Sequence, residues 1–388
     1  MISVSSAPAN SDLVIEAGQV FDGERFLGAR RVEIRNGRIS AVLAAGRELE
    51  TDTIVTLPPD VVLAPGFIDL QANGGGDVLL NAAPSLAAIS RIAAAHRRFG
   101  TTGLLPTLIS DHPDTLAQLL SLAADGLSVP GVLGYHLEGP HLNPARKGIH
   151  PAQHIRPVEA ADIAILKRFA EFGRSLVTLA PECVAPHVIA ELAASGLHLA
   201  VGHSDATAAQ VLAAADHGLT GVTHLFNAMA QMHPREPGVV GAAMADKRLF
   251  AGIICDGLHV APLSLQAAFN AMGRDRLMLV SDAMPTVGGT MPCFKLQDRT
   301  ITLQDGRLTD AQGTLAGAHL TMIGAVQNAV TLMGVSLADA LVMASRTPAR
   351  FLGLEQELGR ISTGYRADCV AFGHDYAVRA TWIAGAGR

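Results

Sequence analysis

The stretch LHLAVGHSDATAAQVLAAADHGLTGVTHLFN, residues 197–227, contains a strand–helix–strand unit in which a histidine follows each strand. Residues 197–202 and 221–223 are short apolar runs, and the alanine-rich residues 207–217 between them suit a helix. This order predicts two parallel strands in one sheet, because the helix returns the chain to the start of the next strand. His203 and His224 then lie at equivalent strand ends.

The same alternation of strands and helices extends from residue 61 to about residue 279. Residues 86–98, for example, suit another of the intervening helices. Eight repeats favour a closed barrel over an open doubly wound sheet, and the chain length suits such a barrel, which needs about 250 residues, plus a smaller domain. The predicted strands are residues 61–69, 103–108, 132–137, 176–179, 197–202, 221–223, 249–254 and 277–280.

The two ends of the chain have a different pattern. Residues 13–57 carry turn signals at Phe21-Asp22-Gly23 and Arg35-Asn36-Gly37 between short alternating runs, which is typical of small antiparallel strands, and residues 367–383 are similar. One such segment can hardly bury its own face, so we expect the two ends to pair. The predicted fold class is α/β: a (β/α)8 TIM-type barrel, residues 61–358, with a small flanking β-sandwich domain built from residues 1–60 and 359–388.

The composition narrows the classes of function. The chain has 388 residues, 49% hydrophobic content and a formal net charge of -6, and its few basic clusters argue against a nucleic-acid-binding face while leaving room for a local anion pocket. Four widely separated cysteines suggest neither a zinc ribbon nor a disulfide framework. Residues 1–12 are small and polar, and charges or glycines interrupt the later apolar runs, so we expect a cytoplasmic protein without a membrane span.

Three side chains that can bind metal follow predicted barrel strands. Glu138 comes after residues 132–137 and precedes Gly-Pro, and His203 and His224 end the two runs described first. Neighbouring strands lie about 4.8 Å apart, so the three side chains could share one divalent ion if all point inward. Taken singly, Glu138 could be a cap or an ion-pair partner, and two of 15 histidines could simply bond backbone carbonyls.

Asp282 follows the last predicted strand and is a candidate for the group that transfers protons. A free carboxylate beside a metal site can accept a proton from water and later pass it to a leaving group. Alone, Asp282 could equally be a turn or helix-cap residue. Its position after the last strand of a barrel, together with the other three side chains, favours metal-assisted hydrolysis.

Eight short motifs in this order resemble the amidohydrolase superfamily, and within it the N-acetylglucosamine-6-phosphate deacetylases, across essentially the whole chain. Each motif alone is weak, whereas all of them in one order are specific. They are Pro65-Gly66-Phe67-Ile68-Asp69, His136-Leu137-Glu138-Gly139-Pro140, Lys147-Gly148-Ile149-His150-Pro151, Gly202-His203-Ser204, Thr223-His224-Leu225-Phe226-Asn227-Ala228-Met229, Arg235-Glu236-Pro237-Gly238, Asp256-Gly257-Leu258-His259-Val260 and Ser281-Asp282-Ala283.

The resemblance implies a role for each matching position. It implies metal ligands at Glu138, His203 and His224, a general base and acid at Asp282, and polarisation of the acetyl carbonyl by His150. The positions that it implies for binding the sugar phosphate are Ile149, Asn227, Ala228, Arg235, His259, Ala316, Gly317 and Ala318. A planar guanidinium such as that of Arg235 suits phosphate because it donates two parallel hydrogen bonds. In isolation, Arg235 and His259 would be read as surface ion-pair or capping groups.

One segment departs from the wider superfamily. The usual His-x-His after the first strand is here Gln71-Ala72-Asn73, and amides are poor ligands for a second zinc ion. We therefore expect one divalent metal ion per chain, with zinc as the first candidate and iron or another divalent ion left open. A purely structural role, in which the two amides bond loops, is the alternative.

The reaction that the resemblance implies is hydrolysis of N-acetyl-D-glucosamine 6-phosphate to D-glucosamine 6-phosphate and acetate, in amino sugar catabolism. Two alternatives stay open: deacetylation of N-acetylgalactosamine 6-phosphate, which differs at one hydroxyl, and a non-catalytic binding module of the same fold. The expected partners are a small sugar phosphate and a second copy of the chain in a homodimer, without nucleic acid or membrane. Whether Arg235 acts in its own site or in the partner's also stays open.

Overall fold

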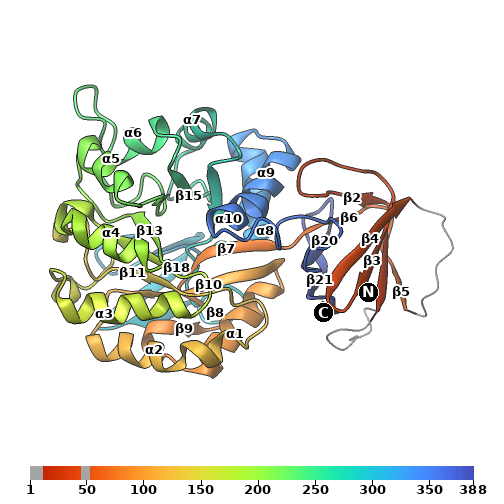
Figure 1. Ribbon diagram of the computed structural model, residues 1–388, viewed down its shortest axis with the longest axis horizontal. Coiled ribbons are helices and arrows are strands. Elements are labelled where there is room, and N and C mark those ends of the chain that lie inside the picture. The colour runs from red at the N-terminus through yellow and green to blue at the C-terminus, as the bar shows by residue number, and fades with distance from the viewer. Residues whose placement is uncertain (1–11, 45–52) are drawn as a thin grey trace.

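Eight parallel strands form one sheet in the order of the chain in the computed structural model, which describes residues 12–44 and 53–388. Almost every residue in these strands is buried, as expected for a parallel sheet covered on both faces. The predicted barrel is therefore confirmed (Figure 1). Its strands are β7 (Phe67–Ala72), β10 (Thr101–Ile109), β11 (His136–Glu138), β12 (Leu176–Leu179), β13 (His198–Val201), β14 (Gly221–Val222), β15 (Phe250–Ile254) and β16 (Leu277–Val280).

Helices surround the barrel and begin at recognisable caps. The Ser85 hydroxyl accepts a hydrogen bond from Ala88 at the start of α1, and Thr207 and Gln210 form a capping box at the start of α5. Both helices match the predicted segments to within a residue or two. The α-helices are α1 (Leu86–Arg97), α2 (Pro113–Gly126), α3 (Ala160–Arg168), α4 (Pro186–Ala194), α5 (Ala208–Asp216), α6 (Gly238–Ala245), α7 (Pro262–Met272), α8 (Met322–Asn328), α9 (Leu337–Ala344) and α10 (Arg346–Phe351).

Short elements connect these strands and helices. A two-residue hairpin, β8 (Gly74–Gly75) and β9 (Val78–Leu79), follows the first barrel strand, and the turns of helix η1 (Leu80–Ala82), η2 (Pro144–Arg146), η3 (Ala152–His154), η4 (Phe169–Glu171), η5 (Pro181–Cys183) and η6 (Ala329–Met333) lie in the loops. No helix in residues 12–44 and 53–388 has both the length and the apolar character needed to cross a bilayer.

A buried carboxylate joins the first and last barrel strands. Ala72 and Ala283 form a single parallel bridge there. Elsewhere between β7 and β16, Asp69 accepts hydrogen bonds from the backbone amide of Ser281 at 3.1 Å and from the Ser281 hydroxyl. It also accepts one from the backbone amide of Gln71 at 3.2 Å. Asp69 therefore holds together the ends of the two strands that position Gln71 and Asp282.

Two mixed sheets, each with one parallel pair of strands among antiparallel ones, form the smaller part of the molecule and pack face to face, as the sandwich prediction requires. Ile15, Leu63 and Trp382 are completely buried between them. One sheet has the order β4 (Arg38–Ala44), β3 (Arg30–Arg35), β1 (Leu13–Ala17), β5 (Ile54–Thr56); the other has β2 (Gln19–Val20), β6 (Val61–Pro65), β20 (Cys369–Gly373), β21 (Val378–Ile383), β22 (Ala386–Gly387).

The pairing of the two chain ends takes place in the second of these sheets. Strand β6 runs antiparallel to β20, with Ala64 opposite Val370. The predicted turn at Asn36-Gly37 joins β3 to β4 with φ angles of +51° and +73°, the signs that a tight hairpin turn requires. The expectation that both ends build one small β domain is thus confirmed.

Two predicted barrel strands are wrong in extent. Residues 61–69 form two strands, because the chain leaves the small sheet at Pro65 and enters the barrel at Phe67. The break is at Gly66, where an added Cβ would lie 2.0 Å from Oγ1 of Thr102. Of residues 132–137, only the last two belong to β11, while Val132 makes an isolated bridge. Both segments are mainly apolar on each side of the break, so hydrophobicity could not locate the change.

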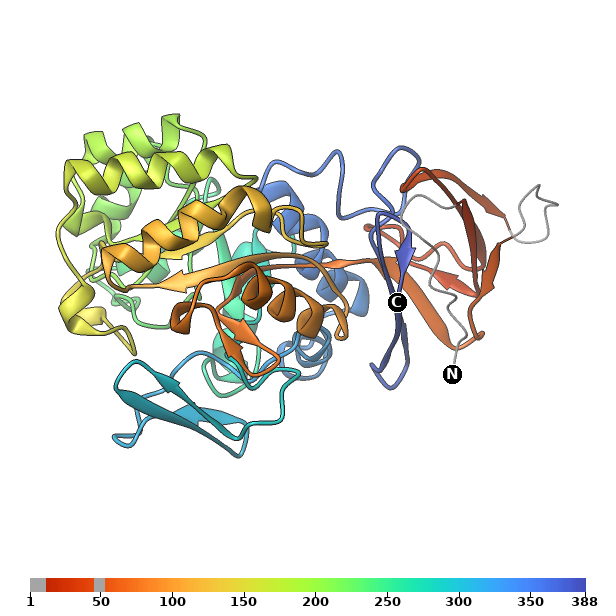
Figure 2. The same cartoon turned by 90° about the horizontal axis from the view of Figure 1, so that it is seen from below.

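A three-stranded antiparallel sheet that the sequence analysis did not foresee follows β16. It consists of β17 (Cys293–Leu296), β18 (Arg299–Gln304) and β19 (Arg307–Thr309). Figure 2 shows it as a separate layer beside the barrel, away from the small two-sheet part. Its apolar face, including Phe294 and Ile301, clusters with Ile149 and Met284 of the barrel loops. This inserted sheet therefore covers one side of the barrel's carboxyl end.

Candidate active site

A cavity of about 330 Å³ opens at the carboxyl ends of the barrel strands, where barrel enzymes place their active sites. Its volume is within the range of small-molecule sites. Loops after six barrel strands and the segment that follows the inserted sheet contribute its walls. The lining residues are Asn73, Ile109, Glu138, Ala145, Arg146, Gly148, Ile149, His150, His203, His224, Asn227, Ala228, Ile254, His259, Asp282, Met284, Thr314, Leu315, Ala316 and Gly317.

Three of the predicted site residues have an unusual backbone. His203, His224 and Asp282 have φ angles of +49°, +32° and +48°, in the left-handed region that residues other than glycine seldom adopt. Each stands at the point where a buried strand turns into a loop. Such strain persists only where the surrounding structure enforces it, and it is concentrated at functional sites. The backbone thus marks three residues that the sequence analysis selected by side chain.

The three predicted metal ligands meet at one point. Oε1 of Glu138 lies 3.1 Å from Nε2 of His203 and 2.9 Å from Nε2 of His224, and the two nitrogens are 3.1 Å apart. Only 2%, 5% and 4% of Glu138, His203 and His224 are exposed. Burial favours the neutral form of Glu138, but the hydrogen bonds and charges of both histidines hold its pKa well below the ordinary value.

This arrangement fits a divalent cation. Nδ1 of His203 donates to the carbonyl of Arg146 at 2.9 Å, so when the ring is neutral the lone pair of Nε2 faces the Glu138 carboxylate. With both rings neutral, the electron pairs of two imidazoles and a carboxylate that converge at about 3 Å repel one another, and a cation between them would remove that repulsion. Two nitrogens and an oxygen are a typical donor set for zinc, and a carbonyl partner on the far ring nitrogen is the usual support.

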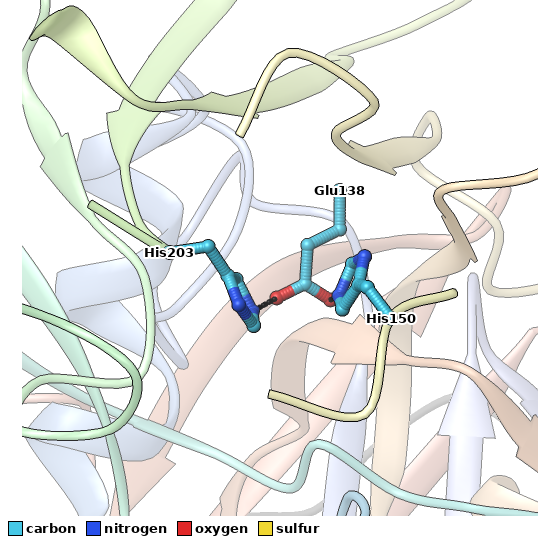
Figure 3. Close-up of side chains that lie close together, drawn as sticks. All are labelled: Glu138, His150 and His203. Carbon is cyan, nitrogen blue, oxygen red and sulfur yellow. Dashed lines mark hydrogen bonds and ion pairs between the residues drawn. The ribbon is translucent and has the colours of Figure 1, made fainter. Parts of the chain in front are cut away.

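His150 lies on the other side of Glu138 (Figure 3). Its Nε2 is 4.0 Å from Oε2 of Glu138, and its ligand atom lies within 4.8 Å of those of Glu138 and His203. The backbone amide of Ser110 donates to Nδ1 of His150 at 3.4 Å, and burial lowers the pKa of His150 well below its ordinary value. The ring is therefore neutral with its proton on Nε2, which is the state of a hydrogen-bond donor.

Asp282 is held by one of the two amides that replace the usual histidines. Nδ2 of Asn73 donates to Oδ1 of Asp282 at 2.7 Å, and Nε2 of Gln71 donates to Oε2 of Glu138 at 3.1 Å. Burial, reinforced by the negative charge of Glu138, raises the pKa of Asp282 to about 7. The amides thus orient the two carboxylates of the site, instead of only bonding loops.

His259 is bonded at both ring nitrogens. Nδ1 lies 2.6 Å from Oδ2 of Asp256 and Nε2 lies 3.0 Å from the carbonyl of Ala316. Burial opposes the charged ring, but the bond to Asp256, its charge and the Ala316 carbonyl together raise the pKa of His259. Because both partners are acceptors, the ring is stable as a cation that donates twice. His259 and Asp256 therefore form a charged pair at the wall of the cavity.

The remaining predicted substrate positions divide into two groups. Ile149, Asn227, Ala228, Ala316 and Gly317 line the cavity. Ala318 and Arg235 do not: the amide of Ala318 donates to the carbonyl of Asp282 at 2.7 Å, and Arg235 is exposed on the segment between β14 and α6.

The cavity also contains residues that sequence reasoning missed. Arg146, Met284 and Leu315 line it although no expectation named them. Arg146 directly precedes the Lys147-Gly148-Ile149-His150-Pro151 motif, which could have suggested it. Leu315 lies near the predicted Ala316–Ala318 stretch, but nothing in its own residue type indicated a cavity wall.

Comparison with known proteins identifies the family. The model of the amidohydrolase family matches residues 62–386. An N-acetylgalactosamine-6-phosphate deacetylase of Shewanella sp. (strain ANA-3) is 43% identical over 325 residues, which cover 83% of this chain and 82% of that one.

Two solved structures are similar over nearly the whole chain. The N-acetylglucosamine-6-phosphate deacetylase of Pasteurella multocida has a TM-score of 0.94 and 31% identity, with 97% of this chain and 100% of that one covered. That of Mycobacterium smegmatis in complex with N-acetyl-D-glucosamine-6-phosphate has a TM-score of 0.90 and 34% identity, with 97% and 99% covered. This chain belongs to the amidohydrolase family, which is metal-dependent.

Proposed function

We propose that the chain hydrolyses the acetamide of N-acetyl-D-glucosamine 6-phosphate to D-glucosamine 6-phosphate and acetate. The observation that carries the proposal is the convergence of Glu138, His203 and His224 on one point, beside Asp282, in a cavity at the carboxyl end of the barrel. The names of the similar deacetylases supply the substrate class.

We place one divalent cation per chain, zinc as first candidate, on Glu138, His203 and His224. When bound, the cation would supply Lewis-acid chemistry, polarising the amide carbonyl and lowering the pKa of water. Gln71 and Asn73 already donate their amide hydrogens to Glu138 and Asp282, so they orient the carboxylates and offer no ligand set for a second cation.

Asp282 moves the proton. It takes one proton from the attacking water as the new C–O bond forms, and it returns that proton to the nitrogen as the C–N bond breaks, because an amide nitrogen leaves poorly as an anion. The bond from Asn73 holds Oδ1 of Asp282, which leaves Oδ2 for this transfer. In the metal-free protein, burial and the charge of Glu138 raise the pKa of Asp282 to about 7, and a raised pKa suits a group that must act first as a base and then as an acid.

His150 and the cavity wall bind the rest of the substrate. His150, protonated on Nε2, donates to the acetyl carbonyl oxygen as negative charge develops there. We assign His259, Ile149, Asn227 and Ala228, with the Ala316–Ala318 stretch, to the sugar phosphate.

Arg235 supports a homodimer. Its side chain is exposed and outside the cavity of its own chain, although a guanidinium is well suited to phosphate. We therefore propose that Arg235 reaches the site of a partner subunit. A cytoplasmic location agrees with this substrate, since a charged sugar phosphate does not cross a membrane unaided.

N-acetylgalactosamine 6-phosphate is a second candidate substrate. The observation that favours it is the 43% identity to a deacetylase named for that sugar. The two sugars differ at a single hydroxyl, and the same four site residues would act on either one.

The test is acetate release from a panel containing both N-acetylated sugar phosphates and their unphosphorylated forms, with metal content measured on the same samples. We expect acetate from a 6-phosphate and about one metal ion per chain. A double variant, His203→Ala with His224→Ala, is the control and should lose both metal and activity. Two tightly bound ions, full occupancy in the double variant, or no acetate from either phosphate would contradict the proposal.

A further inference from the structure

Glu182 lies outside the cavity, yet its carboxylate connects the loops that hold His203. It belongs to η5, directly after β12, the strand between those that carry Glu138 and His203. Oε1 of Glu182 accepts hydrogen bonds from Nδ2 of Asn143 at 2.9 Å and from the amide of Asp205 at 2.6 Å. Oε2 accepts one from the hydroxyl of Ser204 at 2.6 Å.

Each of these three partners either donates a hydrogen bond to His203 or follows it closely in the chain. Asn143 donates its backbone amide to the carbonyl of His203 at 2.9 Å, and Ser204 and Asp205 follow His203 in the chain. Asp205 also accepts from Nε of Arg146 at 2.9 Å. The carbonyl of that same arginine accepts a hydrogen bond from Nδ1 of His203. The backbone of His203 and the far side of its ring are thus fixed through one half-buried carboxylate.

The connection extends to the loop after β14. The amide of Ser204 donates to the carbonyl of Ala228 at 3.2 Å, and the carbonyl of Ser204 accepts from Ala230 at 2.9 Å. Ser204 is completely buried, so its hydroxyl needs the acceptor that Glu182 provides. The left-handed backbone of His203 requires this kind of enforcement from its surroundings.

We infer that Glu182 is a positioning residue for His203: it holds the imidazole in the orientation that binds the metal ion, without touching metal or substrate. The inference rests on the metal site proposed above. Outer partners of metal ligands fix ring orientation, and their loss weakens metal binding by about 10- to 100-fold. The competing explanation is that Glu182 only ties loops together and contributes to stability.

Metal affinity separates the two explanations. We would measure the zinc dissociation constant by competition with a chelator, the absorption spectrum of the cobalt-substituted protein, and Tm. The variants are Glu182→Ala, Glu182→Gln and Ser204→Ala, with Glu191→Gln as the matched control, because Glu191 pairs with Lys167 on the exposed side of α3 and α4. Glu182→Gln and Ser204→Ala carry the test if Glu182→Ala does not fold.

The positioning role predicts graded losses. Glu182→Ala should weaken zinc binding about 10- to 100-fold and shift the cobalt spectrum, while Glu182→Gln and Ser204→Ala should have smaller effects of the same sign. Glu191→Gln should bind as the unmodified protein does. A fall in Tm with unchanged zinc affinity and cobalt spectrum would overturn this inference and leave the proposed function untouched. Absence of stoichiometric zinc in the unmodified protein would overturn the proposed function, and the inference with it.

Discussion

The cavity end of the barrel and the small two-sheet part place their residues by opposite means. At the cavity, histidines and an aspartate adopt the left-handed backbone region, and carboxylates are buried. In the small part, the Asn36-Gly37 hairpin turn uses residues that tolerate positive φ, although Tyr376 and Ala384 adopt it elsewhere in these sheets, and the space between the sheets is filled by apolar side chains such as Ile15 and Trp382.

This difference indicates where stability and activity reside. Left-handed histidines and buried carboxylates cost free energy of folding, and under the proposed function they are kept because the chemistry needs them. A glycine in a hairpin turn and an apolar contact stabilise the fold and have no chemical task. Changes at the cavity should therefore reduce catalysis with little loss of stability, and changes in the small part should do the reverse.

The largest expected effect is that of Asp282→Asn. Removing the proton carrier should lower kcat at least about 100-fold, with metal and substrate binding largely retained. Burial raises the pKa of Asp282 to about 7, so the stability of the metal-free protein should fall as the pH rises from about 4 to about 7, where the buried carboxylate ionises. The amide variant lacks this loss, and its Tm at pH 7 without metal should be equal or higher. A nearly normal kcat would show that another group is the base.

Arg235→Ala should have the next largest effect. Loss of a charge-assisted contact of about 1.5 to 3 kcal/mol should raise KM for the 6-phosphate about 10- to 150-fold. Turnover of the unphosphorylated sugar should barely change. Steady-state kinetics on the two substrates measure the difference, and an equal change in both would contradict phosphate binding by Arg235.

A mixture of subunits tests whether Arg235 acts across the dimer. Combining an Arg235→Ala chain with an Asp282→Asn chain should restore part of the activity if each hybrid dimer assembles one intact site. No recovery after verified exchange of subunits would count against a shared site, though not against phosphate binding within one chain.

Asp256→Asn should reveal that the charged pair of Asp256 and His259 at the cavity wall contributes to stability in a pH-dependent way. The pKa of His259 is raised, so its stabilisation is complete below about pH 6.5 and is lost as the pH rises through the raised value. The pKa of Asp256 is lowered, because the bonds from His259 outweigh burial. Its contribution to stability is therefore lost as the pH falls through the lowered pKa. The difference in free energy of unfolding from the unmodified protein, about 1 kcal/mol, should be largest between about pH 4 and 6.5 and shrink above it. A difference independent of pH would contradict the charged pair.

Gly37→Ala should have the smallest effect and should act on stability only. With φ at +73°, a Cβ at this turn costs about 1 kcal/mol, which urea denaturation can measure, while kcat should not change. Asn36→Gly is the control, since glycine also accepts positive φ and should leave stability nearly unaltered. A fall in kcat would break the separation of stability from activity.

Much of the barrel was predictable, because the helix–strand alternation and the strand-end side chains are local properties of the sequence. Glu138, His203, His224 and Asp282 were selected in this way, and they lie together. The fold boundaries were harder: β6 and β7 form one apolar run, and which sheet each strand joins depends on β20, about 300 residues later. The inserted sheet was also not predicted, since its short strands carry no chemical motif.

The supporting contacts of the site were not predictable for a related reason. The bond from Gln71 to Glu138 and those from three residues to Glu182 join loops that are far apart in the chain. Residue type alone does not specify such partners, because an amide or a carboxylate suits many of them. The left-handed backbone at His203 likewise follows from tertiary packing and has no local sequence signal of its own.

The pairing of β6 with β20 has a consequence for biosynthesis. During translation, Val61–Pro65 leaves the ribosome long before Cys369–Gly373 exists, so one edge of β6 has no partner while most of the chain is made. Unpaired apolar edges are templates for aggregation. The barrel strands between them can assemble in order of synthesis, whereas the small domain must be completed last. Chaperones that shield nascent chains would therefore act on β6 above all, and slow translation of the later segments would lengthen its exposure.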